Sequence, residues 1–174
     1  HPQTWPENLD YKGKKVVVIG SGATAATLVP AIAADVAHVT LLQRSPTYFI
    51  PGRNANELAD TLRELEIDEN WVHEIVRKKI LFDQAAFTRR ALEEPESVTK
   101  DLLAGVRAFL GEDYDVDKHF TPRYRPWRQR IAFVPNGDLF QGIASGKASV
   151  VTDEIARFTD TGLLLKSGET LAAA

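Results

Sequence analysis

The residues best placed to do chemistry are the small ones that follow an apolar run near the amino terminus and fit the pattern GxGxxA. In this pattern the first glycine permits a tight turn and the second lets backbone approach a pyrophosphate. The small third residue lets a helix pack close to a strand. A purely structural strand–helix turn is the alternative, but the flanking strand, helix and second strand favour dinucleotide binding. We therefore expect the cofactor contacts to come from Gly20, Ser21, Gly22, Ala23, Thr24 and Ala25.

The end of the next apolar run indicates which dinucleotide is bound. NAD sites of this type carry an acidic residue about 20 residues beyond the glycines, where it binds the ribose 2′-hydroxyl. This sequence has Gln43, Arg44 and Ser45 there instead. Arg44 can pair with a 2′-phosphate, which a carboxylate would repel. A solvated surface arginine is the alternative. The sequence therefore predicts NADP(H), with these three residues as further cofactor contacts.

Other chemistries are excluded or unsupported by the composition. The chain has no cysteine, so disulfides, thiolate catalysis and cysteine-ligated metals are ruled out. The four histidines (His1, His38, His73 and His119) form no ligand pair, so we expect no metal site. A net charge of -3 gives no electrostatic footprint for nucleic acid. No apolar run reaches the roughly 20 residues needed to span a bilayer and no signal peptide is visible, so we expect a cytoplasmic protein without a transmembrane segment.

The hydrophobic pattern predicts the elements that must position these residues. Continuous apolar runs over 14–20 and 38–44 predict two buried parallel strands, with a helix over 23–34 between them. After a proline-punctuated loop over 45–53, helical spacing predicts an insertion of about four helices. A short helix over 135–147, a third strand over 148–153 and a β-meander follow.

The predicted fold class is therefore α/β, with a Rossmann-like parallel sheet, a helical insertion and a carboxy-terminal β-meander. We expect residues 1–52 and 118–174 to form the NADP(H)-binding domain and residues 53–117 to form the insertion.

Together these motifs resemble the NADPH-binding half of flavin-dependent Baeyer–Villiger monooxygenases. His1, Trp5 and Pro6 match the second half of that family's fingerprint FxGxxxHxxxWP. The glycine loop resembles the family's second dinucleotide loop, and LLQRSPTY resembles its NADPH-selecting segment. The stretch HFTPRYRPWRQR is similar to the subgroup that includes the mycobacterial ethionamide-activating monooxygenase.

The resemblance implies a parent enzyme in which NADPH reduces FAD, and one oxygen atom from O2 is inserted into a ketone to give an ester or lactone. Sulfide oxidation is an implied side activity. FAD would be bound by a domain outside this chain, so the segment alone should be inactive. The resemblance also assigns an active-site arginine, for which Arg130 is the best match and Arg125 and Arg128 are alternatives. Gln129 stands where many relatives have lysine.

Two other interpretations stay open at this point. A pyridine nucleotide–disulfide reductase has a similar build but needs a redox-active cysteine pair. A stand-alone NADP(H)-binding sensor or interaction module would use the apolar faces of the inserted helices to bind a partner protein.

Overall fold

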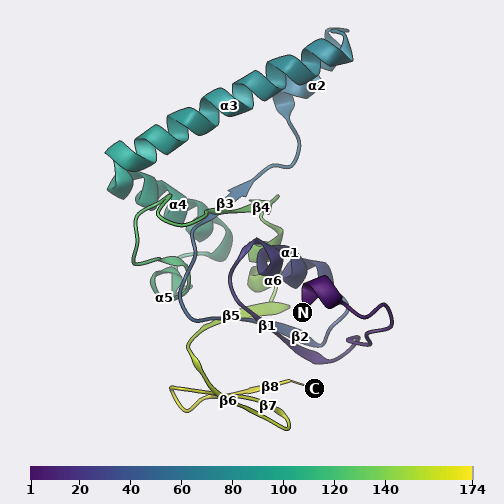
Figure 1. Cartoon of the computed structure of the whole chain (residues 1–174), viewed down its shortest axis with the longest axis vertical. Helices are drawn as coiled ribbons and strands as arrows, with labels where there is room; N and C mark the ends of the chain where they lie inside the picture. Colours follow the sequence, from purple (N-terminus) through teal and green to yellow (C-terminus); the bar gives the residue numbers. More distant parts are fainter. Residues whose placement is uncertain (174) are drawn as a thin grey trace.

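A three-stranded parallel sheet carries the amino-terminal βαβ unit. The computed structural model describes residues 1–173 of the chain. A short 3₁₀ helix, η1 (Pro2–Thr4), precedes strand β1 (Lys15–Ile19), helix α1 (Ala23–Ile32) and strand β2 (His38–Gln43). Strand β5 (Ala148–Thr152) joins on the far side of β2, which gives the order β1–β2–β5 (Figure 1). The predicted α/β class and parallel sheet are confirmed.

A second, two-stranded parallel sheet lies between this sheet and the helical insertion. It pairs β3 (Phe49–Gly52) with β4 (Ala132–Pro135). The prediction that 45–53 is entirely a loop was therefore wrong. Pro51 concealed the strand, because proline is excluded from central strands and tolerated at the edge of a sheet. Strand β4 begins two residues after Arg130.

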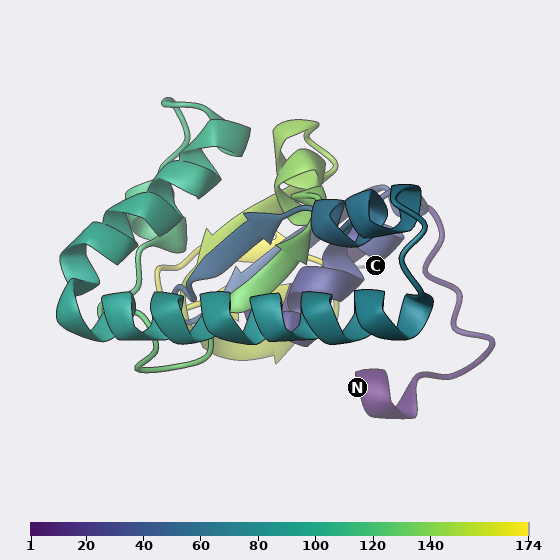
Figure 2. The same cartoon turned by 90° about the horizontal axis from the view of Figure 1, so that it is seen from above.

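Four helices, α2 (Glu57–Glu64), α3 (Glu69–Glu93), α4 (Pro95–Leu110) and α5 (Val116–Phe120), follow β3 and precede β4. The predicted helical insertion is thus confirmed, whereas its expected limits of 53–117 stay a prediction. Below, the insertion denotes the whole segment between β3 and β4, residues 53–131. Helices α2 and α3 project away from both parallel sheets, and α4 packs against β3 and α6 (Asp138–Ala144) (Figures 1 and 2).

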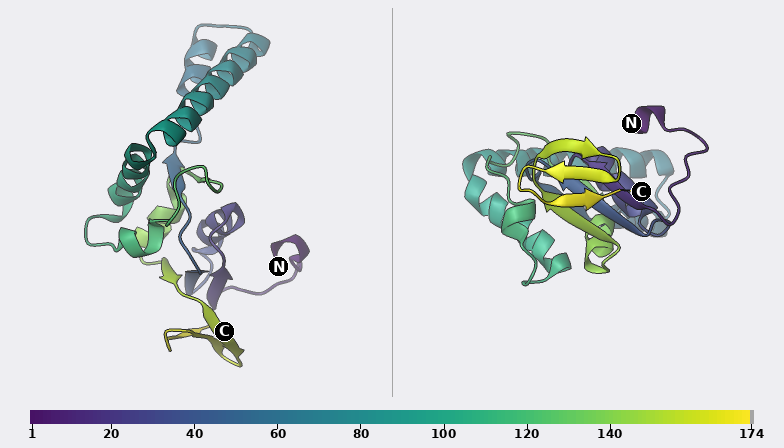
Figure 3. Two further views of the ribbon diagram at one scale, coloured as in Figure 1. Left: turned by 60° about the vertical axis from the view of Figure 1, so that its left-hand side comes forward. Right: turned by 90° about the horizontal axis from the view of Figure 1, so that it is seen from below.

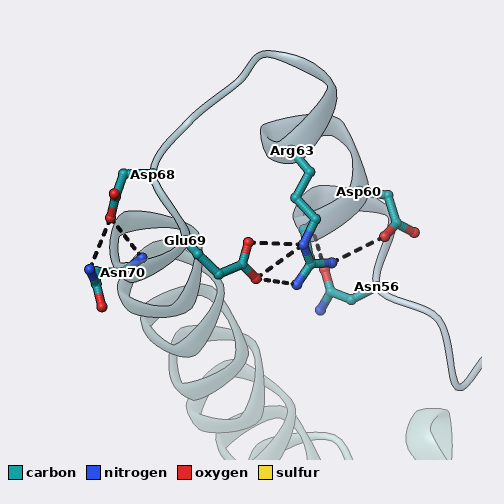
Figure 4. A network of polar contacts seen from close by, with 7 residues as sticks. Asn56, Asp60, Arg63, Asp68, Glu69 and Asn70 are labelled. Carbon is teal, nitrogen blue, oxygen red and sulfur yellow. Dashed lines mark hydrogen bonds and ion pairs between the residues drawn. The ribbon is translucent and has the colours of Figure 1, made fainter.

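The corner between α2 and α3 is held by polar contacts (Figure 4). The Arg63 guanidinium donates to the Glu69 carboxylate, with a closest N–O distance of 2.6 Å, and this hydrogen bond lowers the pKa of Glu69. Asn56 caps α2 by accepting from the Ala59 N–H at 3.0 Å, and Asp68 caps α3 in the same way. Because the ion pair is exposed to solvent, it contributes little to the free energy of folding. Its role is to fix the orientation of α3 relative to α2.

The two faces of the main sheet are covered differently. Helices α1 and α6 cover one face and enclose the largest core with buried residues of β2, β4 and β5. The other face meets the antiparallel meander of β6 (Ile155–Thr159), β7 (Gly162–Leu165) and β8 (Thr170–Ala172) (Figure 3). That contact is made by buried leucines, namely Leu42, Leu163, Leu165 and Leu171. The main sheet is therefore packed on both faces near the carboxyl ends of its strands.

Candidate functional site

The carboxyl ends of β1, β2 and β5 meet at one edge of the sheet, because Ile19 pairs with Leu42 and Gln43 pairs with Thr152. In open α/β sheets this is the edge where ligands bind. Gly20 leaves β1 there with φ +110°, a conformation that residues with a side chain rarely adopt, while its N–H donates to the Leu42 carbonyl at 2.8 Å. The first glycine therefore makes the turn that starts the loop.

The next two residues of the loop behave differently from each other. The Ser21 hydroxyl donates to the Ser45 carbonyl at 3.3 Å and lies 3.0 Å from the Thr47 hydroxyl, so it ties the glycine loop to the segment after β2. Gly22 has an ordinary extended conformation (φ −77°, ψ 177°), and a Cβ atom added there would meet no atom of residues 1–173 within 4 Å. The second glycine is therefore not required by the fold's own geometry or packing, and the space beside it is open.

The start of α1 completes this cradle. Within residues 1–173, no side chain caps the first turn of α1, so its leading N–H groups remain available to an anion. Ala23 and Thr24 are exposed, and Ala25 is buried. The buried alanine lets the helix lie close to the sheet. Such an arrangement can hold a pyrophosphate through backbone groups alone.

Arg44 lies beside the cradle, directly after β2. It lines two adjoining hollows. The first, which we call the loop hollow, measures about 390 Å³, and its lining includes Gly20, Ser21, Arg44, Ser45 and Glu154. The second, which we call the insertion hollow, measures about 570 Å³, and its lining includes Arg44, Lys118, Arg123, Gln129, Asp153 and Glu154. The structure thus brings the glycine loop, Arg44 and Ser45 together.

Two carboxylates share this region with Arg44. Glu154 forms an ion pair with Lys166 at 2.7 Å, and this hydrogen bond, with a smaller contribution from Arg44, lowers its pKa. A hydrogen bond from Ser167, followed by one from the Glu154 N–H, lowers the pKa of Asp153. Both carboxylates are therefore ionised at neutral pH and already have partners.

Gln43 lies in the same strand as expected, but its side chain is only 1% exposed. Its amide nitrogen donates to the His119 carbonyl at 2.6 Å and to the Thr152 hydroxyl at 2.9 Å. The Thr152 hydroxyl also lies 2.8 Å from Nδ1 of His119, whose pKa is lowered mainly by burial. The Gln43 side chain therefore joins β2 to β5 and α5 beneath the hollows, and its contact with a cofactor stays a prediction.

The structure does not bring Arg130 into the lining of either hollow. Arg130 is exposed, directly before the buried Ile131 and strand β4. Its segment is anchored by Trp127, whose ring packs edge-on against Phe87 of α3 at a centroid distance of 6.2 Å. Trp127 also has φ +61°, which is uncommon for a bulky residue. The preceding residue, Gln129, lines the insertion hollow. The side chains of Gln129 and Arg130 therefore have different surroundings.

Several residues of the hollows are not among the predicted ligand contacts. Asp153 and Glu154 could have been found from their position after a parallel strand, where ligands bind. Lys118 and Arg123 come from the end of the helical insertion and reach the site only through tertiary packing, in which α5 contacts β5. Among residues 1–173 no cluster of three or more potential metal ligands is present. Over that range no helix has the length and apolar character needed to cross a membrane.

The sequence is similar to FAD-containing monooxygenases over almost its whole length. It is 50% identical over 174 residues to FAD-containing monooxygenase EthA of Mycobacterium tuberculosis, with 99% of this chain and 35% of that protein covered. It is 48% identical over 174 residues to the probable FAD-binding monooxygenase AlmA of Acinetobacter baylyi, with 99% of this chain and 34% of that protein covered. The chain thus spans about a third of the length of these curated relatives. No family model matches the chain.

A solved structure shows the same fold. Cyclohexanone monooxygenase from Rhodococcus sp. Phi1, solved with NADP+, superimposes with a TM-score of 0.67 at 18% identity, covering 99% of this chain and 39% of that one. The superposition extends over almost all of this chain, and therefore over its parallel sheet, its helices and its antiparallel meander. At this identity the likeness concerns the fold alone.

Proposed function

We propose that this chain, which is similar in sequence to FAD-containing monooxygenases, supplies the NADP(H)-binding part of such an enzyme. The glycine loop and the start of α1 hold the pyrophosphate, and Arg44 pairs with the 2′-phosphate. Ser45 and the backbone at Gln43 border the adenosine ribose. In the whole protein, the proposed reaction inserts one oxygen atom of O2 into a ketone, with sulfide oxidation as a side activity.

The observation that carries this proposal is the open space at Gly22, in a glycine loop whose Gly20 and Ser21 line the same hollow as Arg44. Neither backbone strain nor packing requires this glycine, whose structural role is to cap α1, and the open space at its Cβ has no role in the fold. That space is explained by a ligand whose phosphates approach the backbone. Arg44 adds a permanent cation with fork geometry, which suits a phosphate monoester. The residues present therefore fit NADP(H).

The chemistry of the whole reaction comes from two cofactors: NADPH supplies a hydride, and FAD supplies oxygen activation. The role of this chain is to bind and orient the nucleotide. We assign to Arg130 the stabilisation of negative charge on the reacting oxygen, since a guanidinium holds its positive charge without titrating. The exposed position of Arg130 leaves it open to contact with a neighbouring domain.

The nucleotide assignment is tested by Arg44→Ala in the full-length protein. Loss of a charge-assisted phosphate contact should cost about 1.5–3 kcal/mol, so the Kd for NADP+ should rise roughly ten- to a hundredfold. The Kd for NAD+, which lacks the 2′-phosphate, should stay nearly unchanged. Arg157→Ala is the matched control, because Arg157 is an exposed arginine on β6 outside both hollows. Equal weakening of both nucleotides by Arg44→Ala would refute the assignment.

The assignment of Arg130 is tested by Arg130→Ala, with NADPH consumption and ester formation measured separately. The variant should still oxidise NADPH, while ester formation is lost and hydrogen peroxide accumulates. Arg125→Ala and Arg128→Ala test the two alternative arginines under the same conditions. A normal ester yield from Arg130→Ala would show that this residue has no catalytic role.

A further inference from the structure

We propose that Lys118 and Arg123, at the carboxy-terminal end of the helical insertion, complete the 2′-phosphate site together with Arg44. The inference rests on the proposed binding of NADP(H) and extends it. It makes nucleotide selection a joint property of the α/β sheet and the insertion. The argument begins with the charges that line the insertion hollow.

Three cations line this hollow, and each comes from a different place in the chain. Arg44 follows β2, Lys118 lies in α5, and Arg123 lies in the segment between α5 and β4. Within the part of the chain that the structure describes, none of the three has a carboxylate within ion-pair distance. All three are exposed to solvent and open to a ligand.

The carboxylates of the same hollow are already engaged. Asp117 pairs with Arg107 at 2.8 Å, and Glu154 pairs with Lys166 at 2.7 Å. Asp153 accepts hydrogen bonds from the backbone N–H groups of Glu154 at 2.6 Å and Ser167 at 3.2 Å. Asp117 and Glu154 are thus paired with cations outside the hollow, so three cations face only the charge of Asp153, and the net charge left to attract a ligand is positive. A phosphate monoester, with a charge of about −1.5 to −2 at neutral pH, matches it.

The position of the hollow agrees with this ligand. The loop hollow and the insertion hollow share Arg44, Ser45, Asp153 and Glu154, so they form two sides of one edge of the sheet. A nucleotide whose pyrophosphate lies on the glycine loop would extend over Arg44 toward the insertion hollow. Lys118 is also close enough to Asp153 for its charge to help lower the pKa of that carboxyl. The ammonium therefore lies near the carboxyl end of β5.

The neutral side chain of Gln129 is a reason to expect that other residues of the insertion supply positive charge to the 2′-phosphate site. It lines the hollow with a neutral amide, which can donate a hydrogen bond to phosphate and carries no charge. Lys118 and Arg123 supply the charge that this position lacks. Because Lys118 belongs to α5, an NADP(H) molecule would contact both the sheet and the insertion.

The inference is tested with Lys118→Gln, Arg123→Gln and the double variant of the full-length protein. The Kd for NADP+ and NAD+ is measured by calorimetry, together with the Kd for 2′,5′-ADP and 5′-AMP, which differ by the 2′-phosphate. Each single change should weaken NADP+ and 2′,5′-ADP about three- to tenfold, and the double change more, whereas NAD+ and 5′-AMP should change less than twofold. Arg123→Lys should retain most of the affinity.

Two matched controls remove a positive charge elsewhere. These controls are Lys147→Gln and Arg157→Gln. Lys147 directly precedes β5, at the end of the strand away from the hollow, and Arg157 lies in β6. Both residues are exposed, and neither lines the insertion hollow. Neither should alter the preference for NADP+ over NAD+. Melting temperatures near that of the unmodified protein would show that all variants fold.

The outcomes separate this inference from the proposed function. If Arg44→Ala weakens NADP+ selectively while the double variant binds it normally, the inference is wrong and the proposed function stands. If the double variant weakens NADP+ and NAD+ equally, the two residues have a structural role and the inference is also wrong. If the unmodified protein shows no preference for NADP+, the proposed function itself fails, and the inference with it.

Discussion

The two glycines of the cradle should respond in opposite ways to substitution. Gly20 has φ +110°, so Gly20→Ala places a side chain on a backbone conformation that costs about 1–3 kcal/mol. For a chain of this size, that cost lowers the melting temperature by roughly 2–12 °C. Gly22 is unstrained, and an added Cβ meets nothing within 4 Å. Gly22→Val therefore costs only about 1 kcal/mol, for a weaker helix cap.

The affinity for NADP+, unlike the stability of the fold, should depend strongly on Gly22. A valine there occupies the space that the pyrophosphate needs, so Gly22→Val should abolish NADP+ binding while the protein stays folded. Differential scanning calorimetry measures the stability of both variants, and isothermal titration below the melting temperature measures their affinity. Gly22→Ala should give an intermediate affinity. The reasoning would be refuted if Gly22→Val bound NADP+ as the unmodified protein does.

Two further predictions concern the network beneath the hollows. Gln43→Ala removes the donor to the His119 carbonyl and leaves a cavity, so the free energy of unfolding measured in urea should fall by about 2–3 kcal/mol; an unchanged value would contradict the contacts described for Gln43. Burial lowers the pKa of His119, so its neutral form is favoured in the folded state. Its contribution to stability should be complete above its unfolded pKa of about 6.5 and be lost as the pH falls through the lower folded value. His119→Gln should reduce this pH dependence in urea titrations between pH 7.5 and 5, and an identical profile in the variant would contradict it.

The parts of the fold that could be predicted are those with a local physical signature. The continuous apolar runs of β1 and β2 and the alternating pattern of the meander identify these strands without tertiary information. Strand β3 has no such signature, because Pro51 occurs within it and its pairing partner β4 lies about 80 residues away in the sequence. Its formation depends on the insertion bringing β3 and β4 side by side.

The candidate site divides in the same way. Gly20, Gly22 and Arg44 could be identified from motif spacing, because the strand–loop–helix unit that positions them is continuous in sequence. The burial of the Gln43 side chain could not be predicted, because glutamine occurs both at buried and at solvent-exposed ends of strands. Lys118 and Arg123 could not be found either, because α5 meets β5 only after the chain has passed through the whole insertion.

The central claim is that this chain binds NADP(H) and selects it by the 2′-phosphate. A calorimetric titration of the full-length protein with NADP+ and with NAD+, under identical buffer and salt, tests it most directly. We predict saturable binding of NADP+ with a Kd at least tenfold lower than that for NAD+. The ratio of the two Kd values should decrease as salt is added. Equal affinity for the two nucleotides, or tighter binding of NAD+, would contradict the account.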